Sequence, residues 1–134
     1  MQIIISGVRM EIIIPSIEEI IDINKQLGGG VINRGNLEFL ISKIESKYKD
    51  KDFKKQVAKI AAIIWMHIIE QHPFTDGNKR TATETMLLFL EKNDYYLDCP
   101  VAGKVYLSLK IANHEIEYDT LISWIYGRLK EVKK

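Results

Sequence analysis

The segment from Lys54 to Gln71 reads KKQVAKIAAIIWMHIIEQ and decides the fold. Valine, isoleucine and alanine recur along it at helical spacing, and Trp65 and Met66 make much of the remaining surface apolar too. A helix that is apolar nearly all round is a buried, central helix. The next residue, His72, precedes Pro73 and therefore disfavours helical backbone. The pattern predicts a long central helix that stops where a loop begins.

The chain before this segment predicts two further helices. Ser16 followed three residues later by Glu19 is a capping box, so a helix begins there, and glycines 28–30 end it. The second helix carries an apolar stripe at positions 37, 40, 41 and 44. Ahead of both, isoleucine triplets at 3–5 and 12–14 predict a short N-terminal hairpin.

Three more helices are expected after Gly77. The first begins near Asn78 and ends at Asn93, Pro100 suits the first turn of the second, and the last begins near Asp119. We therefore predict an all-α domain spanning residues 1–134, with six or seven helices and at most a small β-hairpin. The apolar positions of the last two helices are Val101, Val105 and Leu109, and the inward-facing Leu121, Ile125 and Leu129.

The composition and net charge of the chain limit the kinds of partner that are expected. Hydrophobic residues make up 46% of the chain and charged residues 28%, which is typical of a globular protein. Nineteen basic and eighteen acidic residues give a net charge of +1, so global charge favours neither nucleic acid nor a membrane as partner. The single cysteine, Cys99, excludes an internal disulfide. No targeting or membrane-spanning pattern is visible, and the cytoplasm is the expected compartment.

The nine residues from His72 to Arg80, HPFTDGNKR, carry the candidate chemistry. A helix that begins near Asn78 offers unpaired backbone N–H groups and the positive end of its dipole, which together favour an anion such as phosphate. Gly77 allows the backbone to approach that anion closely. Lys79 and Arg80 add positive charge at the end where cations destabilise a helix. The arrangement predicts a bound anion.

Two further side chains of the loop complete a candidate reaction site. Asp76 precedes Gly77, and a carboxylate beside a phosphate site commonly holds Mg²⁺. His72 carries an imidazole, whose ordinary titration range suits proton abstraction near neutral pH. Taken singly, these residues describe a helix terminus, a turn and a solvated surface. Their combination favours a functional site, with Phe74 expected to point into the core and anchor the loop.

The loop HPFTDGNKR resembles the signature of the Fic/Doc superfamily. Its Asn-Lys-Arg ending resembles the Doc (death-on-curing) branch, because the Fic branch usually has Asn-Gly-Arg. The capped first helix, the glycine-rich stretch before Asn36 and the Leu37-Glu38 pair resemble that branch as well. The resemblance covers nearly the whole chain and is weakest over the first dozen residues. It implies a helical Fido fold that uses a nucleoside triphosphate, with ATP expected, and Mg²⁺.

The resemblance also assigns roles to individual residues. It implies that His72 is the general base on a target hydroxyl and that Asp76 is the metal ligand. It further implies a flap that holds the target protein by strand addition. The phosphate-binding residues would be Gly77, Asn78, Lys79 and Arg80. The flap is expected to be a hairpin or loop and would consist of Val31, Ile32, Asn33, Arg34 and Gly35.

One departure from the Fic pattern concerns the type of transfer. Fic proteins that transfer AMP usually carry a second arginine three positions after the first, and here that position is Thr83. The Doc branch is associated with transfer of the terminal phosphate onto a translation elongation-factor GTPase. We therefore expect phosphate transfer, with AMP transfer as the alternative and a non-catalytic nucleotide-binding or partner module as the alternative from another class.

Regulation and other sites follow from what the sequence lacks. The Ser/Thr-x-x-x-Glu-Gly/Asn inhibitory pattern of some Fic proteins is missing, so an antitoxin acting in trans is expected.

No Walker-type phosphate loop occurs, which excludes a P-loop kinase. His67, His72 and His114 could suggest a metal site, but His67 on a buried helix is expected to be a hydrogen-bonded core residue. Trp65 and Trp124 are expected in the core.

Overall fold

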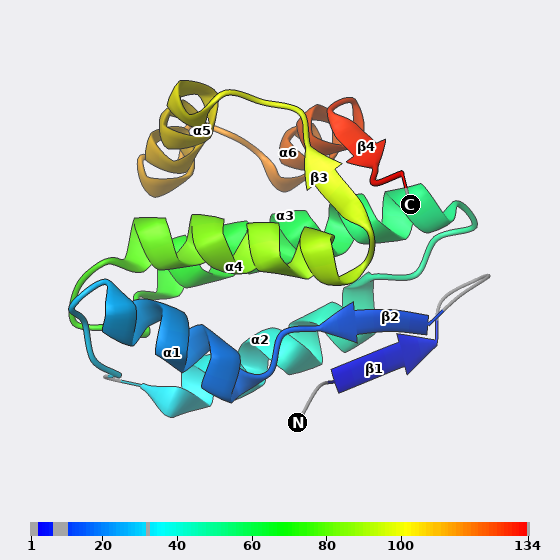
Figure 1. Cartoon of the computed structure of the whole chain (residues 1–134). Coiled ribbons are helices and arrows are strands. Elements are labelled where there is room, and N and C mark those ends of the chain that lie inside the picture. The colour runs from blue at the N-terminus through cyan, green and yellow to red at the C-terminus, as the bar shows by residue number, and fades with distance from the viewer. Residues whose placement is uncertain (1–2, 7–10, 32, 134) are drawn as a thin grey trace.

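The computed structural model describes residues 3–6, 11–31 and 33–133 (Figure 1). Within these ranges the chain forms six helices and four short strands, so the predicted all-α class with a small hairpin is confirmed. The helices are α1 (Ile17–Gln26), α2 (Arg34–Lys47), α3 (Phe53–Gln71), α4 (Asn78–Lys92), α5 (Val101–Ala112) and α6 (Tyr118–Tyr126). The strands are β1 (Ile3–Ser6), β2 (Glu11–Ile14), β3 (Tyr95–Leu97) and β4 (Leu129–Glu131).

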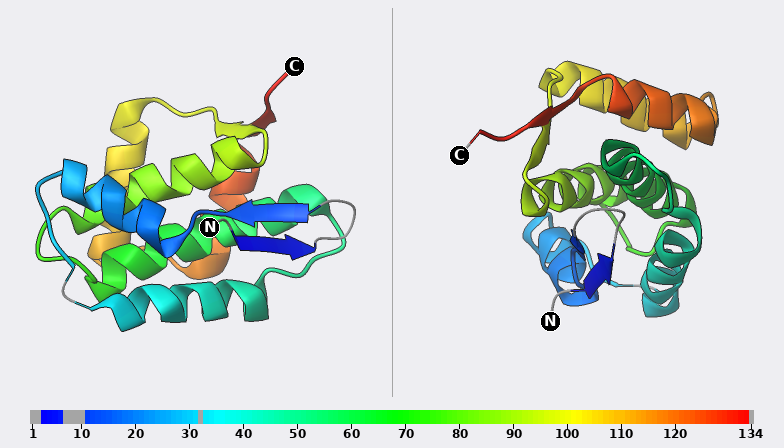
Figure 2. Two further views of the ribbon diagram at one scale, coloured as in Figure 1. Left: turned by 60° about the horizontal axis from the view of Figure 1, so that its bottom comes forward. Right: turned by 90° about the vertical axis from the view of Figure 1, so that its right-hand side faces the viewer.

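Helix α3 is the centre of the molecule, as its apolar sequence predicts. It contacts α2, α4, α5 and α6, and most of its side chains are buried, with Trp65 fully enclosed. Figures 1 and 2 show α3 and α4 as a middle layer, with α5 and α6 on one side and α1, α2 and the N-terminal hairpin on the other. The loop between α3 and α4 therefore joins the two helices of the middle layer.

Both two-stranded sheets are antiparallel, and both contribute buried side chains to the core, among them Ile12, Ile14 and Leu97. The N-terminal hairpin is confirmed, with Ile3 opposite Ile14 and Ser6 opposite Glu11. The second sheet, β3 with β4, was not expected. Leu129 was assigned to the last helix, and this was wrong: α6 ends at Tyr126, and Leu129 is buried in β4. Three-residue strands are too short to show an alternating pattern, which explains the error.

The helices before the loop begin at identifiable caps. Ser16 accepts a hydrogen bond from the backbone N–H of Glu19, and the Glu19 carboxylate accepts one from the backbone N–H of Ser16, which confirms the capping box. Helix α2 begins at Arg34, three residues before the expected Leu37, because the side chain of Asn33 caps it. Between the glycines at 28–30 and the start of α2, the described chain therefore includes only residues 31 and 33.

His67 is a core histidine, as expected. Its side chain is 1% exposed, its Nε2 lies 2.8 Å from the backbone oxygen of Asn36, and its Nδ1 lies 3.0 Å from Nζ of Lys43. Burial lowers the pKa of His67 to about 4, so the ring is neutral at physiological pH. The neutral ring donates to Asn36 and accepts from Lys43, and this links α3 to α2.

Every helix in the described part of the chain is too short or too polar to cross a lipid bilayer.

Candidate active site

His72 ends α3 in an unusual backbone conformation. Its φ is 48° and its ψ is 58°, in the left-handed region that few residues other than glycine adopt. This turn redirects the chain from the axis of α3 into the loop, with Pro73 buried directly behind it. The imidazole itself is exposed. The candidate base is therefore fixed by a buried helix at its backbone and open to solvent at its side chain.

The start of α4 leaves its first N–H groups without a side-chain cap. The N-cap residue is Gly77, with a φ of 73°, and as a glycine it has no side chain that could cap the first N–H groups. Lys79 and Arg80 are both exposed on this turn, and the ion pairs found among the described residues all involve other side chains. Uncapped N–H groups and two unneutralised cations at one helix end together favour a bound anion.

Asn78 braces the loop with its side chain. Its Oδ1 accepts a hydrogen bond from the backbone N–H of Phe74 at 3.1 Å, and its Nδ2 donates to the backbone oxygen of Phe74 at 2.9 Å. Phe74 is 1% exposed, so its side chain lies in the core. Both polar atoms of the Asn78 side chain take part in these hydrogen bonds. Its backbone N–H is therefore the group that remains for the predicted contact with phosphate.

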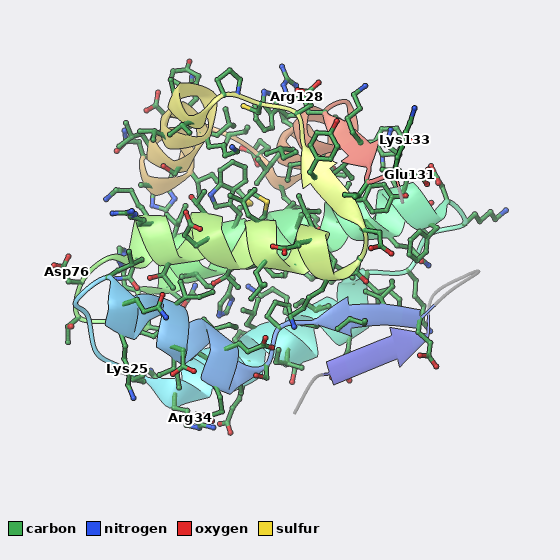
Figure 3. All side chains as sticks on the ribbon, viewed as in Figure 1. Lys25, Arg34, Asp76, Arg128, Glu131 and Lys133 are labelled. Atoms are coloured by element: carbon green, nitrogen blue, oxygen red, sulfur yellow. The ribbon has the colours of Figure 1, made fainter. Side chains whose placement is uncertain are left out.

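Asp76 lies at the outer edge of the molecule, on the loop that leads into α4 (Figure 3). Its Oδ1 accepts a hydrogen bond of 2.8 Å from the backbone N–H of Gly77, and its side chain is exposed. No three histidine, cysteine, aspartate or glutamate side chains of the described chain gather into a metal site. Mg²⁺ is commonly held by one or two carboxylates together with substrate phosphates, so Asp76 beside an anion site fits such a bound ion.

The glycine-rich segment after α1 lies against the loop. Thr75 donates its backbone N–H to the oxygen of Gly30 at 2.9 Å, and its hydroxyl accepts from the N–H of Gly30 at 3.1 Å. Val31 forms an antiparallel bridge with Phe74, and the N–H of Asn33 donates to the oxygen of Pro73 at 3.2 Å. The predicted flap and the predicted catalytic loop, distant in sequence, are therefore hydrogen-bonded to each other.

The predicted flap residues have different positions in this arrangement. Val31 is 39% exposed beside the loop, and Asn33 caps α2. Arg34 and Gly35 were expected in a hairpin or loop, and this was wrong, because Asn33 starts the helix before them. Arg34 pairs with Glu18 of α1, and this hydrogen bond raises the pKa of Arg34. Ile32 lies outside the described residues. Strand addition to this segment stays a prediction.

Asn24 is a site residue that the sequence did not reveal. It is fully buried in α1, and its Nδ2 donates to the backbone oxygen of Asp76 at 2.9 Å and to the hydroxyl of Thr81 at 3.0 Å. It thereby fixes Asp76 and the first turn of α4 relative to α1. A usable signal exists, since Asn24 continues the apolar stripe of Ile20 and Ile21, where a polar side chain requires a buried partner.

Gly29 packs against Asn24 and the backbone of Asp76, so a substitution at Gly29 tests this contact. A Cβ on Gly29 would lie 2.7 Å from the backbone oxygen of Asp76 and against the buried amide of Asn24, whereas a Cβ on Gly30 would find its nearest atom at 3.9 Å. We expect Gly29→Ala to lower the free energy of unfolding by about 1–3 kcal/mol, as overpacking does. Displacement of Asp76 should also lower the transfer activity that the resemblance implies.

Gly30→Ala is the matched control for Gly29→Ala. It should leave the denaturation midpoint and the activity close to those of the wild type. Urea denaturation followed by circular dichroism measures the first effect. Equal midpoints for the two variants would contradict the proposed close packing of Gly29 on the loop.

Thr83 occupies the position of the second arginine of AMP-transferring Fic proteins. Its hydroxyl donates to the backbone oxygen of Lys79 at 3.0 Å and accepts from Nε1 of Trp65 at 3.0 Å. Trp65 is fully buried and packs on Trp124, which is partly buried against the core. Thr83 therefore joins α4 to the central helix and contributes no positive charge to the anion site.

Comparison with known proteins agrees with the position of the loop. A protein-family model described as the Fic/DOC family matches residues 14–90, which is more than half of the chain. The match begins at the end of β2 and extends through α1, α2, α3 and most of α4, so it includes the whole of the loop from His72 to Arg80. No curated protein matches the chain significantly. The chain belongs to the Fic/DOC family.

Proposed function

We propose that this protein transfers the terminal phosphate of a nucleoside triphosphate, with ATP as the expected donor, onto a hydroxyl side chain of another protein. Family membership supports the coarser assignment, a protein-modifying transferase. The choice of phosphate over AMP rests on Thr83, whose hydroxyl is hydrogen-bonded to Trp65 and to the backbone of Lys79. A threonine held in this way cannot provide the planar, two-pronged grip of an arginine on phosphate.

The proposed reaction is an in-line displacement at the γ-phosphorus. The target hydroxyl oxygen forms a bond to this phosphorus, and the bond to the oxygen that bridges the β- and γ-phosphates breaks. The hydroxyl proton passes to the imidazole of His72, and the nucleoside diphosphate leaves. Lys79, Arg80 and the uncapped N–H groups of α4 stabilise the negative charge on the transferred group.

Mg²⁺ is the proposed cofactor, and Asp76 is the residue that would hold it. When bound, Mg²⁺ would supply positive charge that offsets the negative charge of the phosphates. The contribution of the chain is to fix the position of the carboxylate. Asn24 holds the backbone oxygen of Asp76, and the N–H of Gly77 holds one carboxylate oxygen, so the other oxygen remains for a ligand.

The target and the regulator follow from the same proposal. A translation elongation-factor GTPase is the proposed target, and Val31 and its neighbours would align an extended segment of it. An antitoxin acting in trans is the proposed regulator, through a short segment that folds when it binds. Neither partner has to be identified before the transfer itself is tested.

The deciding experiment is transfer from labelled ATP. A cytosolic extract is incubated with the protein and with γ-labelled or α-labelled ATP in parallel. We expect label on a protein from the γ-labelled ATP alone, and a mass increase of one phosphate on the modified protein. Label from α-labelled ATP and the added mass of AMP would establish AMP transfer instead. No label from either, with ATP still bound, would identify a non-catalytic module.

A further inference from the structure

Two residues at the start of α2 hold the chain on either side of His72. Nδ2 of Asn36 donates to the backbone oxygen of Gln71 at 3.3 Å, and the backbone N–H of Asn33 donates to the backbone oxygen of Pro73 at 3.2 Å. Gln71 directly precedes His72 in the chain, and Pro73 directly follows it. Figure 1 shows the start of α2 at the end of the molecule that carries the loop. The residues on both sides of the proposed base are therefore tied to the start of α2.

The backbone at His72 requires such support. Its φ of 48° lies in the left-handed region, which is unfavourable for a residue with a Cβ and persists where surrounding contacts hold it. Gln71 is the last residue of α3, so its carbonyl oxygen has no partner within the helix. Pro73 has no backbone N–H and provides no hydrogen bond to the end of the helix. The side-chain amide of Asn36 supplies this hydrogen bond instead.

The backbone of Asn36 is also held by hydrogen bonds. Its N–H donates to Oδ1 of Asn33 at 3.2 Å, and its oxygen accepts a hydrogen bond of 2.8 Å from Nε2 of His67. The His67 ring is 1% exposed, and its Nδ1 lies 3.0 Å from Nζ of Lys43. These contacts fix the backbone from which the Asn36 amide reaches the end of α3.

We propose that Asn36 is a positioning residue for the proposed base. Its hydrogen bond to Gln71 keeps the end of α3 in the conformation that directs the imidazole of His72 toward the target hydroxyl. A general base has to lie within hydrogen-bond reach of the proton that it removes, and a displacement of about 1 Å can lower a rate about a hundredfold. This inference rests on the proposed function and adds to it the group that orients the base.

The variant that tests this role is Asn36→Leu, which removes the hydrogen-bond donor. Leucine is close to asparagine in size, carries no charge and favours helix, so α2 should stay folded. A charged replacement would shift the pKa of the nearby imidazole, which a neutral one avoids. Ser42→Leu is the matched control, because Ser42 is an exposed polar residue of the same helix outside these contacts. Thermal melting of the whole chain establishes that both variants are folded.

Single-turnover transfer is measured for the wild type, Asn36→Leu, His72→Ala and the double variant. We expect Asn36→Leu to lower the rate about tenfold to a hundredfold in the wild-type background. In the His72→Ala background the loss should be less than about twofold, because a positioning residue acts only through the base that it positions. The KM for ATP should be unchanged, since the proposed phosphate contacts come from α4. Ser42→Leu should leave the rate unchanged in both backgrounds. Equal losses in the two backgrounds, or no loss in the wild-type background, would overturn the role of Asn36.

A second measurement does not depend on transfer. The Cα chemical shift of His72 and the coupling between its amide and Hα protons report its φ in nuclear magnetic resonance. Both should change in Asn36→Leu and stay unchanged in Ser42→Leu, and unchanged His72 resonances in Asn36→Leu would also overturn the proposal. The rates are read on whichever group the wild type transfers. Label from α-labelled ATP would therefore overturn the proposed phosphate transfer and leave the role of Asn36 standing.

Discussion

Replacement of His72 by alanine should lower the rate of transfer about a hundredfold to ten-thousandfold, as expected for the loss of a general base. The imidazole is exposed at the end of α3, so its removal creates no cavity in the core. ATP affinity should stay near that of the wild type, because the proposed phosphate contacts come from α4. Single-turnover transfer from γ-labelled ATP onto the target measures the rate, and calorimetry measures the affinity.

Two further variants separate chemistry from backbone effects. His72 has left-handed backbone, which asparagine tolerates better than alanine, so His72→Asn should retain the stability of the loop and still lack the base. It should lose as much activity as His72→Ala. His114→Ala is the control, because His114 is an exposed histidine outside the loop that pairs with Glu70. This substitution should leave the rate unchanged. Turnover of His72→Asn at the wild-type rate would eliminate His72 as the base.

Local signals in the sequence were sufficient to predict most of the helices. The capping box at Ser16 placed the start of α1 to the residue, and the apolar segment from Lys54 to Gln71 coincides with α3 to within one residue. Each signal is contained in a few neighbouring positions, because caps and helical periodicity depend on residues three or four apart. The loop before α4 was predictable for the same reason.

Contacts between distant segments were not predictable from the same signals. The bond of Asn24 to Asp76 joins residues 52 positions apart, and the pairing of β3 with β4 joins Leu97 to Leu129. Nothing within either short segment specifies its partner, because that choice is made by the packing of α1 on α4 and of α6 on α3. The types of residue proposed to hold the metal and the phosphate could therefore be identified from the sequence, while the groups that position them required the structure.

The role of Thr83 shows how the two kinds of information combine. The sequence identifies a missing arginine, but it does not say what the threonine does instead. The structure places its hydroxyl between Trp65 and the backbone of Lys79. The missing positive charge at the anion site thus has a physical counterpart in the structure, a short side chain whose hydroxyl turns toward the core.

Removal of Mg²⁺, or of the charge on Asp76, should lower transfer by at least about a hundredfold, since a metal ion stabilises transition-state charge by several kcal/mol. Asp76→Asn is the informative variant. Its amide oxygen can still accept the hydrogen bond from the N–H of Gly77, so the loop keeps its shape while the negative charge is lost. Addition of EDTA should abolish wild-type activity, and excess Mg²⁺ should restore it. Asp119→Asn, on the first turn of α6, is the control.

ATP affinity gives Asp76 a signature that a purely structural role would not produce. Without metal, the carboxylate repels the triphosphate, so Asp76→Asn should bind ATP more tightly than the wild type does. With Mg²⁺ present, the carboxylate attracts the metal–nucleotide complex, so the same substitution should weaken binding. The change in affinity should therefore reverse sign when Mg²⁺ is added. If Asp76 serves only to hold the N–H of Gly77, the variant should bind ATP equally well under both conditions, and full transfer activity in EDTA would remove the metal from the mechanism.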